Sequence, residues 1–412
     1  MKYGCIGERL GHSFSKEIHN CFADYEYELM EIPKDELDGF MRSRDFKAIN
    51  VTIPYKEAVI PYLDYIDNAA REIGAVNTIV NIDGKLYGYN TDFYGMSMLI
   101  AHAGVDIKGK KVAILGTGGT SKTATAVTRS LSAGEIILVS RAKSADTVTY
   151  EELYEYHADI DVIINTTPVG MFPNNFASPV DITKFKELSG IVDVVYNPLR
   201  TQLVSEGKRR GISAEGGLYM LVAQAVLASE IFLNKKYESG VLEKVYEKLR
   251  GQKENIVLVG MPSSGKSTVG RKIAERMGRS FYDTDEMIEK NHGMKPAEII
   301  ISKGEATFRD YESEAINQVS LKTGAVIATG GGAVLRAENV NSMLQNGRIY
   351  FLDRPISQLL PTDDRPLTST KDALIKKFND RYDVYLRCSD VRIDASGNVD
   401  EVSDLIMGDF AK

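Results

Sequence analysis

One short stretch has the residue types and spacing of a phosphate-binding loop. Residues 260–267, Gly-Met-Pro-Ser-Ser-Gly-Lys-Ser, fit the pattern G-x-x-x-x-G-K-[ST] between a hydrophobic run and a segment of helical composition. In this context backbone N–H groups cradle phosphate oxygens, Lys266 reaches the β- and γ-phosphates, and the Ser267 hydroxyl binds Mg²⁺. The pattern predicts ATP-dependent phosphoryl transfer, against the alternative of a Gly-Ser loop with an accidental lysine. The residues expected to bind the nucleotide are Gly260, Ser263, Gly265, Lys266, Ser267 and Thr268.

Carboxylates, arginines and glycines follow this loop. Asp283 and Asp285 stand two residues apart after a short hydrophobic run and could serve a metal and a substrate hydroxyl, respectively. Arg309 and Glu312 lie one helical turn apart, and residues 330–332 are three glycines where bare backbone can approach a ligand. Two later arginines are Arg365 and Arg381. Taken singly, such arginines form surface ion pairs and the glycine run forms a turn.

A second glycine-rich turn lies in the first half of the chain. Residues 116–123, Gly-Thr-Gly-Gly-Thr-Ser-Lys-Thr, follow a predicted strand and open a predicted helix, where Gly116 and Gly118 permit a tight turn and close approach of a pyrophosphate. A plain strand–helix turn is the alternative. The next strand ends in Ser-Arg-Ala-Lys rather than in the carboxylate typical of NAD enzymes. Arg141 can pair with a 2′-phosphate, which favours NADP, although it could also be a solvated loop cation. The residues predicted to bind NADP are Gly116, Gly118, Gly119, Ser140, Arg141 and Lys143.

Three polar clusters precede this turn. Ser13 and Ser15 are two residues apart, so in an extended segment both hydroxyls would face one side. The other two clusters contain Thr52 with Lys56, and Asn77 with Asn90, Thr91 and Asp92. Serine pairs also cap helices, and Asn-Thr-Asp clusters also form turns.

Hydrophobic runs that read as strands alternate with helical stretches along almost the whole chain. This alternation predicts an α/β fold with largely parallel sheets. The predicted domains are residues 1–102 (substrate binding, completed by about 216–250), 103–215 (Rossmann type) and 254–412 (P-loop type), with a short linker at 251–254.

Composition narrows the class of protein. The 412 residues are 43% hydrophobic and 26% charged, with a net charge of −7, which is typical of a globular protein and argues against nucleic acid as the main partner. The three scattered cysteines show no metal spacing and no disulfide framework, and no apolar run approaches membrane-spanning length. We therefore expect a cytoplasmic protein with small-molecule substrates; a homodimer is one candidate assembly.

The motifs of the first half, taken together and in order, closely resemble shikimate dehydrogenase. They are S-x-S, N-V-T-x-P-x-K, G-A-V-N-T, G-x-N-T-D, G-x-G-G, N-T-T-P-x-G-M and G-x-x-M-L-x-x-Q-A, and they cover residues 1–250. The resemblance implies reduction of 3-dehydroshikimate to shikimate with NADPH, with Lys56 and Asp92 as the catalytic pair. It leaves open which of the two donates the proton. The other substrate-binding residues implied are Ser13, Ser15, Thr52, Asn77, Tyr196, Gly217 and Gln224.

The second half resembles shikimate kinase over residues 254–412, through D-x-D, G-E-x-x-F-R-x-x-E, T-G-G-G and R-P-L motifs and an Arg-x-x-x-Tyr element. This resemblance implies that Arg309 and Arg381 bind the shikimate carboxylate and that Lys266 and Arg365 stabilise the transferring phosphoryl group. Asp285 would be the base and Asp283, with Ser267, would hold Mg²⁺. Gly331 and Gly332 would bind substrate hydroxyls through their backbone.

The kinase half departs from the family in the segment around Pro361 and in residues 392–402, so we expect weak ATP binding. The two halves would share shikimate as product and substrate, which makes a bifunctional enzyme the main hypothesis. Two alternatives are a quinate/shikimate dehydrogenase that uses NAD and a kinase-like half that senses nucleotide or shikimate without turnover.

Overall fold

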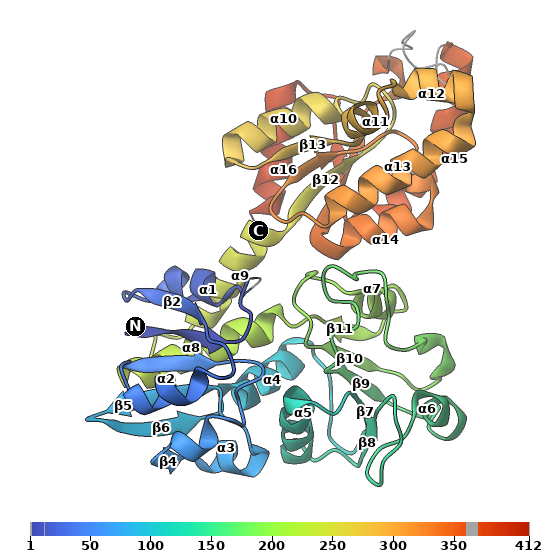
Figure 1. Cartoon of the computed structure of the whole chain (residues 1–412). Coiled ribbons are helices and arrows are strands. Elements are labelled where there is room, and N and C mark those ends of the chain that lie inside the picture. Colours follow the sequence, from blue (N-terminus) through green and yellow to red (C-terminus); the bar gives the residue numbers. More distant parts are fainter. Residues whose placement is uncertain (1, 12, 360–369, 412) are drawn as a thin grey trace. The chain divides into compact units, whose positions relative to one another are not determined.

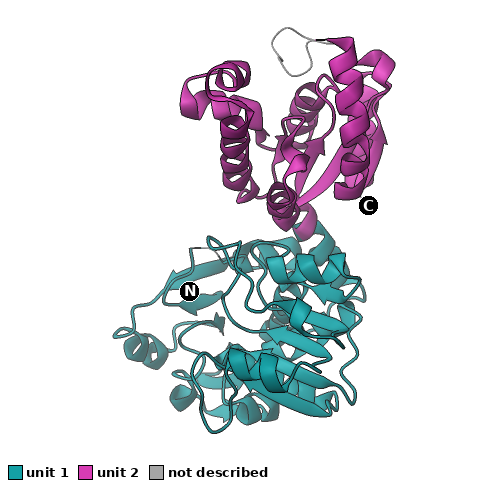
Figure 2. Ribbon diagram, turned by 90° about the vertical axis from the view of Figure 1, so that its right-hand side faces the viewer, with its two compact units in different colours: residues 1–249 teal, residues 250–412 magenta. Residues whose placement is uncertain are grey.

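The computed structural model describes residues 2–11, 13–359 and 370–411, and it divides the chain into two compact units, residues 1–249 and 250–412 (Figures 1 and 2). Each unit is a layered α/β structure, as the alternation of strand-like and helical segments predicts. The predicted fold class is therefore confirmed.

The first unit begins with a mixed sheet. In the described part of the chain this sheet has six strands in the order β2-β1-β3-β5-β6-β4. Strand β1 is parallel to its neighbours β2 and β3, whereas β5 is antiparallel to its neighbours β3 and β6. Its strands are β1 (Tyr3–Gly7), β2 (Tyr27–Glu31), β3 (Ala48–Val51), β4 (Tyr65–Ile66), β5 (Thr78–Ile82) and β6 (Lys85–Tyr89). The accompanying helices are α1 (Ser15–Phe22), α2 (Leu37–Ser43), η1 (Ile60–Tyr62), α3 (Asn68–Ile73) and α4 (Thr91–His102).

A long apolar helix from much later in the chain belongs to this part of the fold. Helix α8 (Leu218–Leu233) packs against α1, α4, β3 and β5. Its contact with α4 is close: a Cβ on Gly95 would lie 2.8 Å from the Met220 carbonyl oxygen. Because α8 returns to the first sheet, residues near position 220 can reach a site built from residues 10–92.

The second sheet of this unit is wholly parallel. Its strands are β7 (Lys111–Leu115), β8 (Glu135–Val139), β9 (Val162–Asn165), β10 (Gly190–Asp193) and β11 (Ser213–Glu215), in the order β11-β10-β9-β7-β8. The helices between them are α5 (Gly119–Ser130), α6 (Tyr150–Tyr156), η2 (Ile182–Lys184) and α7 (Gln202–Arg209). The strand order reverses at β7, and in doubly wound sheets ligands bind at that point, beyond the carboxyl ends of the strands. The glycine-rich turn at 116–119 follows β7.

Helix α9 (Val241–Lys253) spans the boundary between the units. It buries Leu242, Val245, Tyr246 and Leu249 in the core of the first unit. The segment predicted as a linker, 251–254, is the last turn of this helix together with Glu254, which directly precedes the first strand of the second unit.

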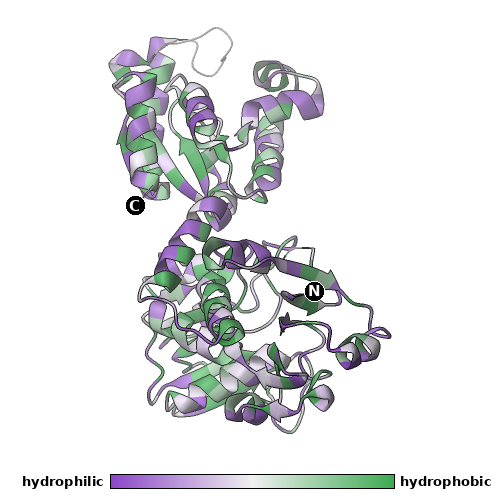
Figure 3. Cartoon of the chain, turned by 90° about the vertical axis from the view of Figure 1, so that its left-hand side faces the viewer, coloured by the Kyte–Doolittle hydropathy of each residue, from purple (hydrophilic) through white to green (hydrophobic). Residues whose placement is uncertain are grey.

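The second unit has a parallel sheet in the order β13-β14-β12-β15-β16, formed by strands that are largely hydrophobic (Figure 3). Its strands are β12 (Asn255–Val259), β13 (Phe281–Asp283), β14 (Val326–Ala328), β15 (Gly347–Asp353) and β16 (Val391–Asp394). Its helices are α10 (Lys266–Met277), α11 (Thr284–His292), α12 (Pro296–Lys303), α13 (Glu305–Ser320), η3 (Ala333–Leu335), α14 (Ala337–Asn346), η4 (Ile356–Gln358), α15 (Lys371–Cys388) and α16 (Val399–Phe410). All five residues of β12 are buried, which is typical of a central parallel strand covered by helices on both faces.

Candidate active sites

A cavity of about 350 Å³ in the first unit gathers residues that are far apart in the sequence. Thr120 of α5 and Val194 after β10 line it together with residues of the first sheet and of α8, so it lies where the two sheets of this unit meet. The predicted residues that line it are Ser13, Ser15, Thr52, Lys56, Asn77, Asp92, Tyr196, Gly217 and Gln224.

Lys56 and Asp92 form an ion pair in this cavity. The Lys56 Nζ and Asp92 Oδ2 atoms are 2.5 Å apart, and the two side chains are only 19% and 11% exposed. Asp92 lies in the first turn of α4, where the helix dipole favours a negative charge, and Asn90 caps that helix by accepting a hydrogen bond from Phe93 N. Partial burial strengthens the attraction between the two charges relative to a pair in bulk water. The ion pair is therefore already formed in the wall of the cavity.

A network of neutral polar groups adjoins this pair. The Asn77 amide oxygen accepts a hydrogen bond from Thr91 N at 2.8 Å, and the Thr91 hydroxyl donates to Gln224 Oε1 at 3.4 Å. Asn50 donates to Thr78 Oγ1 at 3.1 Å and accepts from the buried hydroxyl of Tyr27 at 2.7 Å. Thr91 thus links two predicted hydroxyl-binding residues, Asn77 and Gln224. The sequence interpretation gave it no role, although it stands inside the Asn-Thr-Asp cluster.

Ser13 and Ser15 are adjacent, but not for the predicted reason. Phe14 has helical backbone angles and Ser15 is the first residue of α1, so the segment is not extended. The Ser13 hydroxyl nevertheless donates to the Ser15 hydroxyl at 3.1 Å and accepts from Ser15 N at 3.3 Å. The helix start, rather than strand alternation, brings the two hydroxyls together.

Two ionisable side chains in the cavity wall stay uncharged. Burial raises the pKa of the Cys5 thiol to about 12 and also raises the pKa of the Tyr196 hydroxyl. Cys5 is therefore a protonated, unreactive thiol near neutral pH, and Tyr196 keeps its hydroxyl proton as a hydrogen-bond donor. Lys56, Asp92 and the exposed Arg9 carry the charges among the residues that line this cavity.

The turn after β7 is shaped for a ligand in front of α5. Gly116 has a φ of 103°, and a Cβ there would lie 3.0 Å from Thr166 Oγ1, so the turn itself requires glycine. A Cβ on Gly118 or Gly119 would meet no protein atom within 4 Å. These two glycines border open space at the N-terminus of α5, whose free N–H groups attract anions. The residues present therefore fit a dinucleotide pyrophosphate.

The cationic residues after β8 lie beside this turn. Gly116 N donates to Val139 O at 2.8 Å, so Ser140 and Arg141 follow directly at the same edge of the sheet. Arg141 is exposed, whereas Lys143 forms an ion pair with Glu152, which also belongs to the capping box of α6. Arg141 is thus better placed than Lys143 to meet an anionic group on a nucleotide.

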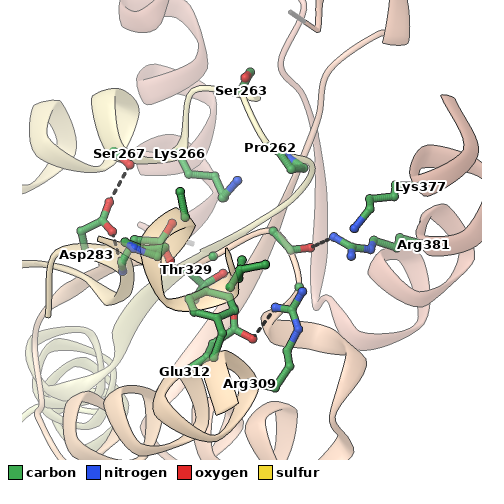
Figure 4. Close-up of a pocket in the computed structure, with 18 of the residues that line it drawn as sticks. Pro262, Ser263, Lys266, Ser267, Asp283, Arg309, Glu312, Thr329, Lys377 and Arg381 are labelled. Atoms are coloured by element: carbon green, nitrogen blue, oxygen red, sulfur yellow. Dashed lines mark hydrogen bonds and ion pairs between the residues drawn. The ribbon is translucent and has the colours of Figure 1, made fainter. Parts of the chain in front are cut away.

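The second unit has a cavity of about 390 Å³ at the carboxyl ends of β12, β13 and β14 (Figure 4). The P-loop forms one wall, and α12, α13 and α15 form the others. The predicted residues that line it are Ser263, Gly265, Lys266, Ser267, Thr268, Asp283, Asp285, Arg309, Gly331, Gly332 and Arg381. Gly260 begins the loop with a φ of 148° and packs against the Leu352 carbonyl oxygen instead. Arg365 and Pro361 lie outside the described residues.

The P-loop lysine and serine have short hydrogen bonds. The Lys266 ammonium donates to the carbonyl oxygens of Gly260 and Met261 at 2.9 and 2.8 Å, and the Ser267 hydroxyl donates to Asp283 Oδ2 at 2.6 Å. In the described chain no group of three or more His, Cys, Asp or Glu side chains could hold a metal. One hydroxyl and one carboxylate suit Mg²⁺, which keeps several waters and takes its remaining ligands from substrate phosphates.

Two buried arginines meet at the other end of this cavity. Arg309 donates to Glu312 Oε2 at 2.7 Å and to Glu305 Oε1 at 2.9 Å, while Arg381 donates to the Gly331 carbonyl oxygen at 2.9 Å. Burial raises the pKa of the Glu312 carboxyl, and the neighbouring Arg309 guanidinium opposes this shift. The arrangement holds both guanidinium groups in fixed positions.

The three glycines 330–332 are needed for the packing of neighbouring side chains as well as for the shape of the cavity. A Cβ on Gly330 would lie 2.6 Å from Glu312 Oε1, and one on Gly331 would lie 2.8 Å from Pro262 Cδ. A Cβ on Gly332 would overlap the Arg309 guanidinium. The glycines were predicted because bare backbone can approach a ligand; in the structure, neighbouring side chains already fill the space that their Cβ atoms would need.

Sequence reasoning missed several residues that line this cavity. They are Pro262, Pro296, Ala297, Ile300, Phe308, Glu312, Thr329 and Lys377. Glu312 was noted beside Arg309 but given no role. Among the apolar members, Phe308 stands inside the G-E-x-x-F-R-x-x-E motif without an assigned role, and the others carry no sequence signal of a site. Lys377 stands four residues before Arg381 and so shares its helix face.

Family comparisons agree with the two units. Residues 5–79 match the model of the shikimate dehydrogenase substrate-binding domain, and residues 262–410 match that of shikimate kinase. A shikimate dehydrogenase (NADP(+)) from Clostridium perfringens (strain SM101) is 40% identical over 266 residues, which cover 60% of this chain and 98% of that protein. The chain belongs to the shikimate dehydrogenase family. Its C-terminal unit adds a shikimate kinase domain.

Solved structures support the same assignment for the first unit. Shikimate dehydrogenase 1 from Peptoclostridium difficile is 37% identical, with a TM-score of 0.55 over 60% of this chain and 98% of that one. A shikimate 5-dehydrogenase from Thermus thermophilus in complex with NADP(H) and shikimate is 28% identical, with a TM-score of 0.54 over 60% of this chain and 99% of that one.

Among the residues that the structure describes, no helix is both long enough and apolar enough to cross a membrane.

Proposed function

We propose that this chain is a bifunctional enzyme that makes shikimate 3-phosphate from 3-dehydroshikimate. The first unit reduces the ring ketone to shikimate with NADPH, and the second unit transfers the γ-phosphoryl group of ATP to the 3-hydroxyl. The observation that carries the proposal is that each unit has one cavity suited to one of these steps, and that both steps act on the same acid.

In the first unit, the Lys56–Asp92 pair would manage the proton of the reduction. NADPH supplies the hydride that adds to the ketone carbon, and the oxygen then needs a proton and a stabilising charge. The Lys56 ammonium, 2.5 Å from Asp92 Oδ2, can supply both, with Asp92 keeping it in place. In this pair the Asp92 carboxylate accepts the hydrogen bond and the Lys56 ammonium donates it. This geometry favours Lys56 as the donor.

The neutral residues of the same cavity would orient the acid. Asn77 and Gln224, tied together through Thr91, offer amide groups to ring hydroxyls. The Ser15 hydroxyl offers a donor to a carboxylate, and the Ser13 hydroxyl would become a second donor by turning away from Ser15. Neutral donors can hold a carboxylate without placing a competing cation beside Lys56. Thr52, Tyr196 and Gly217 complete the wall.

Cofactor choice would rest on Arg141. In this role the exposed guanidinium, at the same strand edge as the Gly116 turn, pairs with the 2′-phosphate of NADP, while Gly118 and Gly119 leave room for the pyrophosphate. If the first unit instead preferred NAD, as in the quinate/shikimate alternative, the ratio of kcat/KM for NADP to that for NAD would fall below one.

In the second unit, Asp285 would accept the proton of the 3-hydroxyl as its oxygen bonds to the γ-phosphorus and ADP leaves. Lys266 would stabilise the charge on the transferring group, and Arg309 with Arg381 would hold the acid's carboxylate. Ser267 and Asp283, joined at 2.6 Å, would hold Mg²⁺, which neutralises phosphate charge. We also assign Arg365 to this site from its position in the sequence.

Separate assays of the whole chain test the two activities. NADPH oxidation with 3-dehydroshikimate should need no ATP, and ADP release should need shikimate and Mg²⁺ but no NADPH. If the second unit were only a sensor, shikimate and ATP would bind without ADP release.

We further propose that the protein acts in the cytoplasm, since its three cysteines are free thiols.

A further inference from the structure

Lys377 reaches the acid-binding end of the kinase cavity from α15. It lies one helical turn before Arg381, and Figure 4 shows both side chains entering the cavity from the same helix, with Arg309 below them. The side chain is half-buried, and the described residues provide no hydrogen-bond partner for its ammonium group. Placing two cations four residues apart on a helix destabilises the helix. An anion bound between them would relieve this repulsion.

The charges around Arg309 show why a third cation matters. Glu305 and Glu312 both pair with Arg309, so this guanidinium is matched by two carboxylates. Arg381 then offsets the surplus negative charge. Among these five side chains Lys377 is the third cation, and with it they carry a net positive charge.

The surroundings of Lys377 also suit a group that changes charge with pH. Its pKa is lowered, first by burial, and then by the positive charges of Arg381 on its own helix and Arg309 on α13. Glu305 on α13 and Asp380 on α15 oppose this shift. Unlike the two arginines, Lys377 can therefore lose its proton as the solution becomes alkaline.

We propose that Lys377 binds the carboxylate of the acceptor acid as a third cation beside Arg309 and Arg381, and that it makes the site selective for acids over uncharged analogues. This inference rests on the proposed kinase function, because the acceptor is taken to be shikimate. The residue acts by contact with substrate rather than by positioning another group.

Three variants of the full chain test the proposal. Lys377→Met removes the charge and keeps the length; we expect the KM for shikimate to rise about tenfold, with the KM for ATP unchanged. Lys377→Arg keeps a cation and should retain affinity. Lys376→Met, which alters an exposed neighbour on the same helix, is the control and should change neither constant.

Two further readouts separate substrate binding from a merely structural role. The wild-type KM for shikimate should rise as alkaline pH removes the Lys377 proton, and this rise should be absent in Lys377→Arg. The preference for shikimate over its methyl ester should fall in Lys377→Met, because the ester lacks the charge that Lys377 binds. An unchanged KM and an unchanged acid-to-ester preference in Lys377→Met would overturn the proposal.

Calorimetric titration of the full chain with shikimate distinguishes this proposal from the proposed function. The dehydrogenase cavity also binds shikimate in our proposal, so the binding site to compare between variants is the second one, in the kinase cavity. If the wild type binds shikimate at this second site without phosphorylating it and Lys377→Met binds it more weakly there, the kinase function fails while the role of Lys377 stands. If the wild type phosphorylates shikimate and Lys377→Met binds it equally well at both sites, the role of Lys377 fails alone. If the wild type has no second site for shikimate, both are overturned.

Discussion

The two cavities handle charge in opposite ways. The dehydrogenase cavity contains one ion pair, Lys56–Asp92, beside a network of neutral amides and hydroxyls. The kinase cavity brings together Lys266, Lys377, Arg309 and Arg381 with several carboxylates. Reducing a ketone needs one proton at one atom, whereas moving a phosphoryl group needs several charges to be neutralised together. The difference indicates that charge density, more than cavity size, separates the two functions.

The largest effect should follow from removing the P-loop cation. Lys266→Met should lower kcat for shikimate phosphorylation by roughly 10³-fold or more, because the transferring group loses its principal cation. Steady-state ADP release measures this effect. NADPH oxidation by the same variant is the internal control and should match the wild type. Equal loss of both activities would mean that the charge is needed for folding rather than for catalysis.

Next in size is the dehydrogenase ion pair. Lys56→Ala should lower kcat for 3-dehydroshikimate reduction by roughly 10²- to 10⁴-fold while changing the affinity for NADP little, since Lys56 lines the substrate cavity and not the turn after β7. Steady-state kinetics and a separate NADP titration measure the two effects. A kcat near the wild-type value would remove Lys56 from the mechanism.

The glycines of the two sites should respond differently to a single methyl group. Gly332→Ala would place its Cβ on the Arg309 guanidinium, so we expect a higher KM for shikimate and a lower melting temperature. Gly118→Ala meets no protein atom, so it should leave the melting temperature nearly unchanged and raise the KM for NADPH. A normal KM for NADPH in Gly118→Ala would mean that the cofactor does not approach this turn.

The smallest effect, over the range from pH 7.5 to 5.5, concerns stability in acid and should be confined to the first unit. Burial lowers the pKa of His19 to about 3, and its ring stacks on Tyr27 with 3.9 Å between centroids. In the unfolded chain His19 binds a proton near pH 6.5, whereas in the folded chain it does not. The free energy of unfolding should therefore fall as pH drops from about 6.5 toward 3. For one proton, the free energy of unfolding changes by about 1.4 kcal/mol per pH unit.

Comparison with His19→Phe isolates this effect. Asp193, whose pKa burial raises to about 6, works in the opposite direction over part of the range, since its contribution is lost as pH rises. The difference between wild type and His19→Phe cancels the contribution of Asp193. Hydrogen exchange of β1 and α8 at pH 7.5 and pH 5.5 measures this difference in stability in the full chain. An equal pH dependence in wild type and His19→Phe would contradict the assignment to His19.

Much of the fold could be predicted because its signals are local. Continuous hydrophobic runs such as residues 112–115 and 256–259 predicted buried parallel strands, and the glycine-rich turns after them predicted the starts of α5 and α10. The adjacency of Ser13 and Ser15 was predicted for the wrong reason, because two alternating residues look the same whether a strand or a helix start follows. The sequence pattern alone does not distinguish them.

The parts of the site that escaped prediction depend on tertiary contacts. Thr91 links Asn77 to Gln224 only because α8 returns to the first sheet. The need for glycine at position 332 comes from Arg309 on another helix. Lys377 looks like any surface lysine until the fold places α15 and α13 around the same cavity. Such roles arise from segments that are distant in the chain.

We propose above all that one chain carries out two consecutive reactions on the same acid. The most direct test is to incubate the full chain with 3-dehydroshikimate, NADPH, ATP and Mg²⁺ and to identify the products by mass. We expect shikimate 3-phosphate from the complete mixture, and shikimate alone when ATP is omitted. Accumulation of shikimate without phosphate in the complete mixture, or unchanged 3-dehydroshikimate, would contradict it.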